Sequence, residues 1–281
     1  GLGNKFLANI REVDAIVHVI RCFNDDDVVH VSGSVDPRRD IEIINLELVL
    51  VLSDLNQIEK RRTRLKKQLS TNKEAKLEDE TLEKLILALE NENAVRNVLL
   101  TEEEKNLIKP LGLLTQKPII YATNLGEDEL SKGNDFSEEV NNLATQEGSE
   151  CVKVSAQVEA ELIELGEEER DDYLNGLGVE EGGLISLIKA TYRLLGLSTY
   201  FTTGEKETKA WTISDGMTAP QAAGVIHTDF EKGFIRAQTI SYEKLLEAGS
   251  LSEARNKGWL RSEGKEYVVN EGDVMEFLFN V

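Results

Sequence analysis

A short polar turn follows an apolar run at residues 117–127, KPIIYATNLGE. The apolar residues 119–121 predict a buried strand, and the turn after it carries an amide, Asn124, and a carboxylate, Glu127. Open α/β sheets bind their ligands at the carboxyl ends of the strands, where this turn would lie. An ordinary polar turn can have the same composition, so the binding hypothesis needs support from other residues.

The turn reads Asn124-Leu125-Gly126-Glu127, where P-loop GTPases carry Asn-Lys-x-Asp. In those proteins the carboxylate accepts two hydrogen bonds from guanine, while the lysine stem packs on the ring. Here Leu125 could still cover a purine face, but the carboxylate is one methylene longer. Adenine offers one amino donor beside an acceptor, whereas guanine offers two donors. The turn therefore disfavours guanine.

A second polar turn, Ser155-Ala156-Gln157, follows a predicted strand at residues 150–154. A predicted helix at 137–147 separates the two strands, and the usual right-handed crossover makes them parallel, with both carboxyl ends on one side. In nucleotide-binding P-loop domains, a Ser-Ala pair at this place lends backbone N–H groups to the base. The pair is a weak signal alone and a good one after Asn-x-x-Glu, so the two turns predict one nucleotide pocket.

Two histidines occur near the start of the chain. His18 lies inside a predicted buried strand at residues 14–23, which favours a core position over catalysis. His30 lies in the following loop, 24–37, from which it could reach a phosphate and orient water. A loop histidine by itself is more often simply solvated, so both interpretations of His30 stay open.

Helical periodicity at residues 40–69 and 77–100 predicts two long antiparallel helices that project from the sheet. Thr101 and Glu104 then predict a capping box. Positive charge gathers near the end of the first helix, which indicates either a solvated helix face or an RNA contact. The cluster comprises Lys60, Arg61, Arg62, Arg64, Lys66 and Lys67.

The rest of the chain offers no obvious chemistry. Residues 159–175 are acidic and predict a surface helix without a catalytic role. From Leu197 onward, short predicted strands at 199–202, 210–213, 234–240, 267–269 and 274–279 surround one helix at 219–227, a β-grasp-like pattern.

The 281 residues, 40% of them hydrophobic, can bury a substantial core in about two domains. A formal net charge of −20 disfavours non-specific binding to nucleic acid, so an RNA contact needs a local basic patch. Cys22 and Cys151 lie beside apolar runs, which favours reduced thiols and a cytosolic location. No apolar run approaches the roughly 20 residues that span a bilayer.

The sequence resembles the YchF subfamily of Obg-related P-loop NTPases over essentially its whole length. The resemblance is carried by GLGNKFLANIRE, RCFNDDDVVHVSG, NLGE, SAQVEAEL, APQAAGVIHTDFEKGFIRAQTIS and EGDVMEFLFNV. It implies an α/β fold: a P-loop NTPase-type parallel sheet, an antiparallel helical coiled-coil insertion and a C-terminal β-grasp domain, the ubiquitin-like TGS domain. The implied boundaries are 1–48 and 110–196 for the nucleotide-binding domain, 49–109 for the insertion and 197–281 for the TGS domain.

In that family the Asn-x-x-Glu motif goes with ATP in preference to GTP, and members are ribosome-associated ATPases connected with translation and stress responses. The resemblance implies ATP and Mg²⁺ as cofactors and a cytoplasmic location without a membrane contact. It implies the ribosome as partner, as the large subunit or the 70S particle, with a possible RNA contact through the helical insertion. The implied base-side residues are Asn124, Leu125, Glu127, Ser155 and Ala156.

His30 matches a loop histidine that these enzymes use in hydrolysis, since they have an apolar residue in place of the glutamine of Ras-like GTPases. One departure from the family is large, because the sequence contains no Gly-x4-Gly-Lys-Ser/Thr, nor the Asp-x-x-Gly expected just before Gly1. The phosphate cradle and the magnesium ligands are therefore expected in a missing segment. We expect the chain as given to be inactive as an ATPase, with part of its sheet edge and one face uncovered.

Two other functions remain open. The first is a non-catalytic, nucleotide-gated binding module that contacts the ribosome or other partners through the helical insertion and the TGS domain. The second is an Obg-like GTPase, which Asn-x-x-Glu disfavours. Nucleotide turnover by a protein that contains the P-loop separates the ATPase from the binding module.

Overall fold

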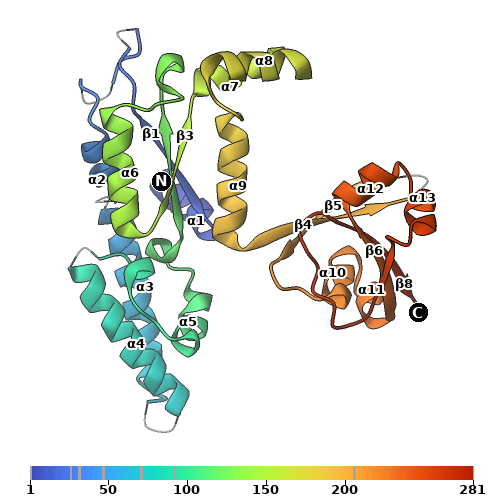
Figure 1. Ribbon diagram of the computed structural model, residues 1–281. Helices are drawn as coiled ribbons and strands as arrows, with labels where there is room; N and C mark the ends of the chain where they lie inside the picture. The colour runs from blue at the N-terminus through green and yellow to red at the C-terminus, as the bar shows by residue number, and fades with distance from the viewer. Residues whose placement is uncertain are drawn as a thin grey trace. The chain divides into compact units, whose positions relative to one another are not determined.

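The computed structural model describes residues 2–25, 27–30, 33–45, 48–69, 72–91, 93–204 and 207–280. The chain divides into two compact units, Gly1–Thr191 and Tyr192–Val281. The first unit contains a parallel sheet and a helical part, and the second contains a separate mixed sheet (Figure 1).

The first unit is built on three parallel strands in the order β1-β2-β3. These are β1 (Ile16–Arg21), β2 (Ile119–Asn124) and β3 (Glu150–Val154). The first five residues of β2 are buried, as expected for a central strand. Asn124 at the end of β2 pairs with Arg21 on one side and Val154 on the other, so the three strands end at one edge. The predicted α/β fold with a parallel sheet is confirmed.

Helices precede, connect and follow these strands. They are α1 (Leu2–Glu12), α2 (Pro37–Asn45), α6 (Asp135–Glu147), α7 (Ala156–Glu164), α8 (Glu167–Leu177) and α9 (Gly183–Leu195), with a 3-10 turn, η4 (Glu127–Glu129). Of these, α2 and α6 contact the strands most extensively. α6 starts with a capping box at Asn134 and ends at Gly148, whose φ of 68° favours glycine. Gly183 lets α9 approach β3 closely, because a Cβ there would lie 2.7 Å from the Cα of Val154.

β1 lies at the edge of the described sheet. Its Val17 and Val19 side chains are 38% and 61% exposed, whereas Ile20 is buried. Both valines lie on the same face of β1, so this face of the sheet edge presents apolar surface. His18 is buried beside the ring of Tyr121, with ring centroids 5.7 Å apart, and burial lowers its pKa. Its predicted core position is therefore correct.

The helical part contains α3 (Leu48–Leu65), α4 (Lys73–Glu90) and α5 (Glu102–Ile108), with 3-10 turns η1 (Val95–Asn97), η2 (Lys109–Leu111) and η3 (Leu114–Gln116). The helix expected over 40–69 is described as α2 and α3, and residues 46 and 47 between them lie outside the described residues. The helix expected over 77–100 ends earlier, at Glu90, with residue 92 outside the described residues. The predicted capping box at Thr101 and Glu104 is present.

The second unit is a five-stranded mixed sheet in the order β5-β4-β8-β6-β7, in which only the β4–β8 pair is parallel among the described strands. Its strands are β4 (Leu197–Thr203), β5 (Thr208–Ser214), β6 (Phe234–Ser241), β7 (Arg261–Glu263) and β8 (Asp273–Phe279). The strand predicted at 267–269 is wrong, because only an isolated bridge from Val268 to Thr218 forms there, and β7 was not predicted.

One helix of the second unit packs against this sheet and contributes to its hydrophobic core. In α10 (Ala219–Ile226), Ala219, Ala222 and Ala223 are fully buried, and their small side chains allow close approach to the strands. The remaining helices are α11 (Thr228–Lys232), α12 (Tyr242–Ala248) and α13 (Leu251–Asn256). None of the helices in the described ranges is long and apolar enough to cross a membrane.

A buried carboxylate fastens the helical part to the segment that returns to the sheet. Asp54 of α3 is fully buried and accepts hydrogen bonds from the backbone N–H of Leu114 at 2.9 Å, and from the N–H and hydroxyl of Thr115 at 2.8 Å. Burial raises the pKa of Asp54 even though these three donors lower it. The Asp54 carboxyl group therefore binds its proton more tightly in the folded chain than in the unfolded chain. Its contribution to stability falls as the pH rises through its folded pKa.

We predict that Asp54→Asn lowers the free energy of unfolding by about 2–4 kcal/mol, because an amide NH₂ would face donors that now share a carboxylate. Urea denaturation measures the change. The control is Asp128→Asn, at an exposed carboxylate, which should stay within about 0.5 kcal/mol of the parent chain. Equal unfolding midpoints for the two variants would contradict the fastening role of Asp54.

Candidate functional site

The two polar turns predicted from the sequence are joined in the structure. The backbone N–H of Leu125 donates to the carbonyl oxygen of Val154 at 2.9 Å, which continues the β2–β3 ladder by one bond. The N–H of Ala156 then donates to Oδ1 of Asn124, also at 2.9 Å. The Asn124 amide is therefore the bridge that holds the second turn against the first.

The Ser155 side chain supports a helix. Its exposed fraction is 1%, and its hydroxyl accepts from the N–H of Val158 at 3.5 Å as the N-cap of α7. Ala156, the next residue, is exposed. The hydroxyl is thus buried and caps the helix, and Ala156 is the exposed residue of this turn.

The structure differs from the expectation for Leu125. Its side chain is 2% exposed and belongs to the core cluster of Ile20, Ile41 and Val140. In this structure the side chain is directed into the core, so it presents no open surface to a purine ring. The Asn-x-x-Glu turn offers a ligand its polar groups and its backbone.

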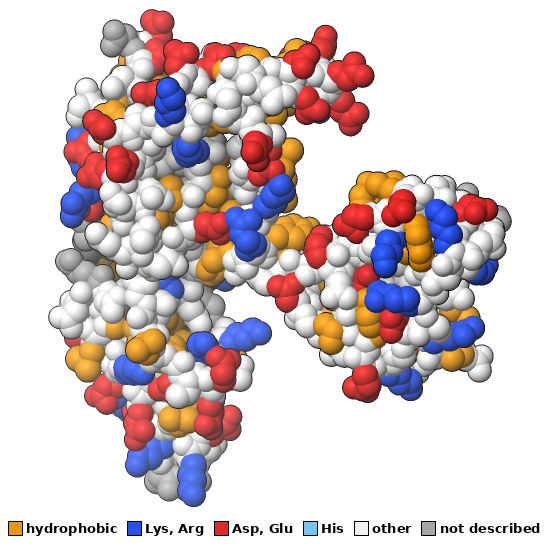
Figure 2. Space-filling model, in the orientation of Figure 1, with side chains coloured by type: hydrophobic (Ala, Val, Ile, Leu, Met, Phe, Trp, Pro, Cys, Tyr) orange, Lys and Arg blue, Asp and Glu red, His pale blue; other side chains and the backbone are white. Residues whose placement is uncertain are grey.

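Glu127 is held by a tyrosine from a distant part of the chain. The Tyr173 hydroxyl lies 3.0 Å from Oε1 of Glu127 and 2.5 Å from Oε2 of Glu161. The hydrogen bond to Glu161, then burial, then the bond to Glu127 raise the pKa of Tyr173, so the phenol stays protonated at neutral pH. Tyr173 lies on α8, within the acidic segment interpreted from sequence as a surface without chemistry. Figure 2 shows the Asp and Glu side chains gathered over this helix.

The loop that carries His30 is organised by the end of β1. The Arg21 guanidinium donates to the carbonyl oxygens of Phe23, Asp25 and Val28 at 3.1, 3.2 and 2.8 Å. Residues 26, 31 and 32 of this loop lie outside the described residues.

His30 itself lies 2.9 Å from the Asp40 carboxylate, measured from Nε2 to Oδ2. The two side chains are 16% and 21% exposed. This contact sets His30 against α2 and gives its ring a carboxylate partner.

The basic cluster is split between paired and exposed cations. Arg61 contacts Glu78 through two bonds of 2.6 and 2.7 Å, and Arg62 contacts Asp79 through two bonds of 2.7 and 3.0 Å. Glu78 is only 4% exposed. The other four cations are exposed, and no ion pair is recorded for them within the described ranges. These four are Lys60, Arg64, Lys66 and Lys67. Arg61 and Arg62 therefore serve α3–α4 packing first.

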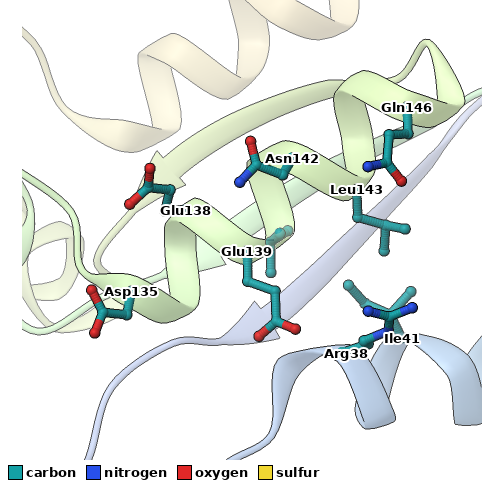
Figure 3. A pocket seen from close by; sticks show the side chains of 9 residues that line it. Arg38, Ile41, Asp135, Glu138, Glu139, Asn142, Leu143 and Gln146 are labelled. Atoms are coloured by element: carbon teal, nitrogen blue, oxygen red, sulfur yellow. The ribbon is translucent and has the colours of Figure 1, made fainter.

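Two hollows lie away from the joined turns. One of about 400 Å³ lies between α2 and α6 and is lined by Arg38 and Ile41 of α2 and by Asp135, Glu138 and Glu139 of α6. Figure 3 shows Glu138 pointing away from Arg38. The carboxylates of this hollow would repel a phosphate group. Another, of about 790 Å³, is lined on its basic side by Arg11, Lys60, Arg61 and Arg64. Of these two hollows, the second has the charge to attract an anion.

Comparison with known proteins identifies the family. The model YchF-GTPase_C, described as a protein of unknown function (DUF933), matches residues 197–280. The chain is 52% identical to the proteins named Ribosome-binding ATPase YchF from Bacillus subtilis and Escherichia coli O157:H7, over 100% of its own length and 77% of theirs. The chain belongs to the YchF family.

A solved YchF structure agrees. The Schizosaccharomyces pombe YchF GTPase superposes with a TM-score of 0.84 at 36% identity, over 99% of this chain and 75% of that one. The names of the YchF relatives differ on the nucleotide, since the bacterial proteins are named ATPase and the Schizosaccharomyces pombe protein is named GTPase.

We predict that Leu125→Lys destabilises the chain by several kcal/mol, because it would place an ammonium group in an apolar cluster. The matched variant Leu125→Met nearly conserves volume and should cost less than about 1.5 kcal/mol. Thermal melting compares the two. A Lys variant as stable as the Met variant would mean that the side chain can leave the core.

Proposed function

We propose that this chain is a ribosome-associated nucleotide-binding protein whose intact form hydrolyses ATP with Mg²⁺. The observation that carries the proposal is the bond from Ala156 N–H to Asn124 Oδ1, which fixes two polar turns at one edge of a parallel sheet. The 52% identity to proteins named Ribosome-binding ATPase supports the same assignment. The link to translation and stress responses is part of this proposal.

Each site residue has a proposed role. Asn124 holds the turn of Ser155 and Ala156, whose backbone faces the base, and Glu127 accepts a hydrogen bond from the adenine amino group. Leu125 contributes through its backbone, because its side chain belongs to the core. Adenine is favoured over guanine because adenine offers one amino donor beside an acceptor, whereas guanine offers two donors and needs both carboxylate oxygens.

At the phosphates, the proposed role of this chain falls to a histidine. His30, oriented by Asp40 at 2.9 Å, is proposed to place the attacking water. Among the described residues there is no cluster of three or more His, Cys, Asp or Glu side chains that could hold a metal ion. Magnesium would neutralise phosphate charge when bound, and its ligands are proposed outside this sequence.

The domain division remains part of the proposal. We assign residues 1–48 and 110–196 to the nucleotide-binding domain, 49–109 to a coiled-coil insertion and 197–281 to a β-grasp domain of the TGS type. The mixed sheet around α10 and the neighbouring helices α3 and α4 support these assignments. A cytoplasmic location follows from the proposed ribosome partner.

A GTPase is the second candidate, favoured by the name of the Schizosaccharomyces pombe relative. Competition between ATP and GTP for the chain tests the first candidate against it. Binding of ATP that GTP cannot displace at equal concentration supports the ATPase, and the reverse result supports the GTPase.

We predict that the 281-residue chain alone releases no phosphate from Mg·ATP above a buffer blank, because its sequence has no Gly-x4-Gly-Lys-Ser/Thr to hold the phosphates. A phosphate-release assay at millimolar ATP measures this. Turnover that His30→Ala abolishes would refute the prediction.

The exposed members of the basic cluster are the proposed ribosome contact. Replacing three of them should weaken ribosome co-sedimentation and flatten its salt dependence by about one unit of log–log slope for each phosphate that is no longer neutralised. The substitutions are Lys60→Glu, Arg64→Glu and Lys67→Glu, which spare the pairs of Arg61 and Arg62.

A control triple carries the same charge change in the second unit, at exposed lysines. It comprises Lys232→Glu, Lys244→Glu and Lys265→Glu. If the control weakens co-sedimentation and the first triple does not, the contact belongs to the second unit.

A further inference from the structure

Tyr173 connects three elements that meet beside the turn of residues 124–127. It lies on α8, while its two partners come from η4, which begins at Glu127, and from α7, which carries Glu161. α7 begins at Ala156, directly after its N-cap Ser155, so this contact links both halves of the candidate site.

The contact has a direct effect on what Glu127 can bind. A carboxylate has two oxygens, and guanine engages both through its N1–H and its amino group. In this chain Oε1 of Glu127 lies 3.0 Å from the Tyr173 hydroxyl. Each carboxylate oxygen has two lone pairs, so the hydroxyl takes one of the two on Oε1 and leaves both on Oε2. A base that needs both oxygens, as guanine does, competes with Tyr173 at Oε1, whereas the single amino group on the corresponding edge of adenine can use Oε2 alone.

The same contact restrains the side chain. Glutamate has one more rotatable bond than aspartate, and ordering it on a ligand costs conformational entropy. A hydroxyl anchored by α8 holds the Glu127 carboxylate before a base arrives. The longer side chain can thus act as a fixed acceptor, which an unanchored glutamate cannot.

We propose that Tyr173 is a specificity-determining positioning residue that holds one oxygen of Glu127 and thereby favours adenine over guanine nucleotides. The inference rests on the proposed base-binding role of Glu127. Glu161 is a competing acceptor, because the phenol has one hydrogen and two carboxylates lie within reach of it. Removing the Glu161 charge should therefore direct that hydrogen to Glu127.

The test is the ratio of ATP to GTP affinity, measured by calorimetry on the 281-residue chain. Tyr173→Phe should lower this ratio about fivefold to tenfold, the size of one ordinary hydrogen bond, because both oxygens of Glu127 become available to guanine. A purely structural role would weaken both nucleotides alike and leave the ratio unchanged. The matched variant Glu161→Gln should keep or raise the ratio.

A third variant, Glu127→Ala, separates the base-binding role of Glu127 from the positioning role of Tyr173. If Glu127→Ala changes the ratio and Tyr173→Phe does not, the positioning role is overturned and the base site stands. If Glu127→Ala leaves the ratio unchanged, or the parent chain binds neither nucleotide or prefers GTP, the proposed adenine site fails and this inference fails with it. Melting curves identify any variant whose fold is disturbed.

Discussion

The register of the three parallel strands is the constraint on which the rest of the first unit depends. Asn124 pairs with both Arg21 and Val154, which are the last residues of the neighbouring strands. The segments that follow the three strands therefore all start from the same edge of the sheet. The Asn124 amide then ties the next βα turn to this edge through Ala156. A shift of one residue in β3 would turn its side chains to the opposite face and separate the two turns. The polar site is thus a consequence of strand packing.

Local sequence signals predicted the elements that this register uses. The apolar run before Asn124, the capping box at Thr101 and the core position of His18 were all predictable, because each depends on neighbours in sequence or on burial of a continuous run. The contact between Tyr173 and Glu127 spans 46 residues, and an exposed acidic helix gives no periodic signal for it. Only the Asn-x-x-Glu pattern marked Glu127 in advance.

Two further differences between the sequence-based predictions and the structure also arise from contacts that the local sequence does not report. Leu125 follows a strand residue whose side chain bridges to the next turn, so it is directed into the core, and a motif comparison cannot indicate that direction. Arg61 and Arg62 count as positive charge in the sequence, but their bidentate partners on α4 offset that charge in the fold. In the second unit, the parallel pairing of β4 with β8 joins residues far apart in the chain, and no local pattern reports it.

The net charge of −20 affects the base side and the phosphate side of the proposed nucleotide site differently. Adenine is neutral, so carboxylates such as Glu127 can read it by accepting hydrogen bonds without electrostatic repulsion from the base. Phosphates are anionic, and the acidic walls of the hollow between α2 and α6 cannot hold them. An acidic chain of this kind can build the base side of a nucleotide site from its own surplus of carboxylates. The phosphate side instead requires backbone N–H groups, lysine and a metal ion, which offset negative charge locally whatever the total.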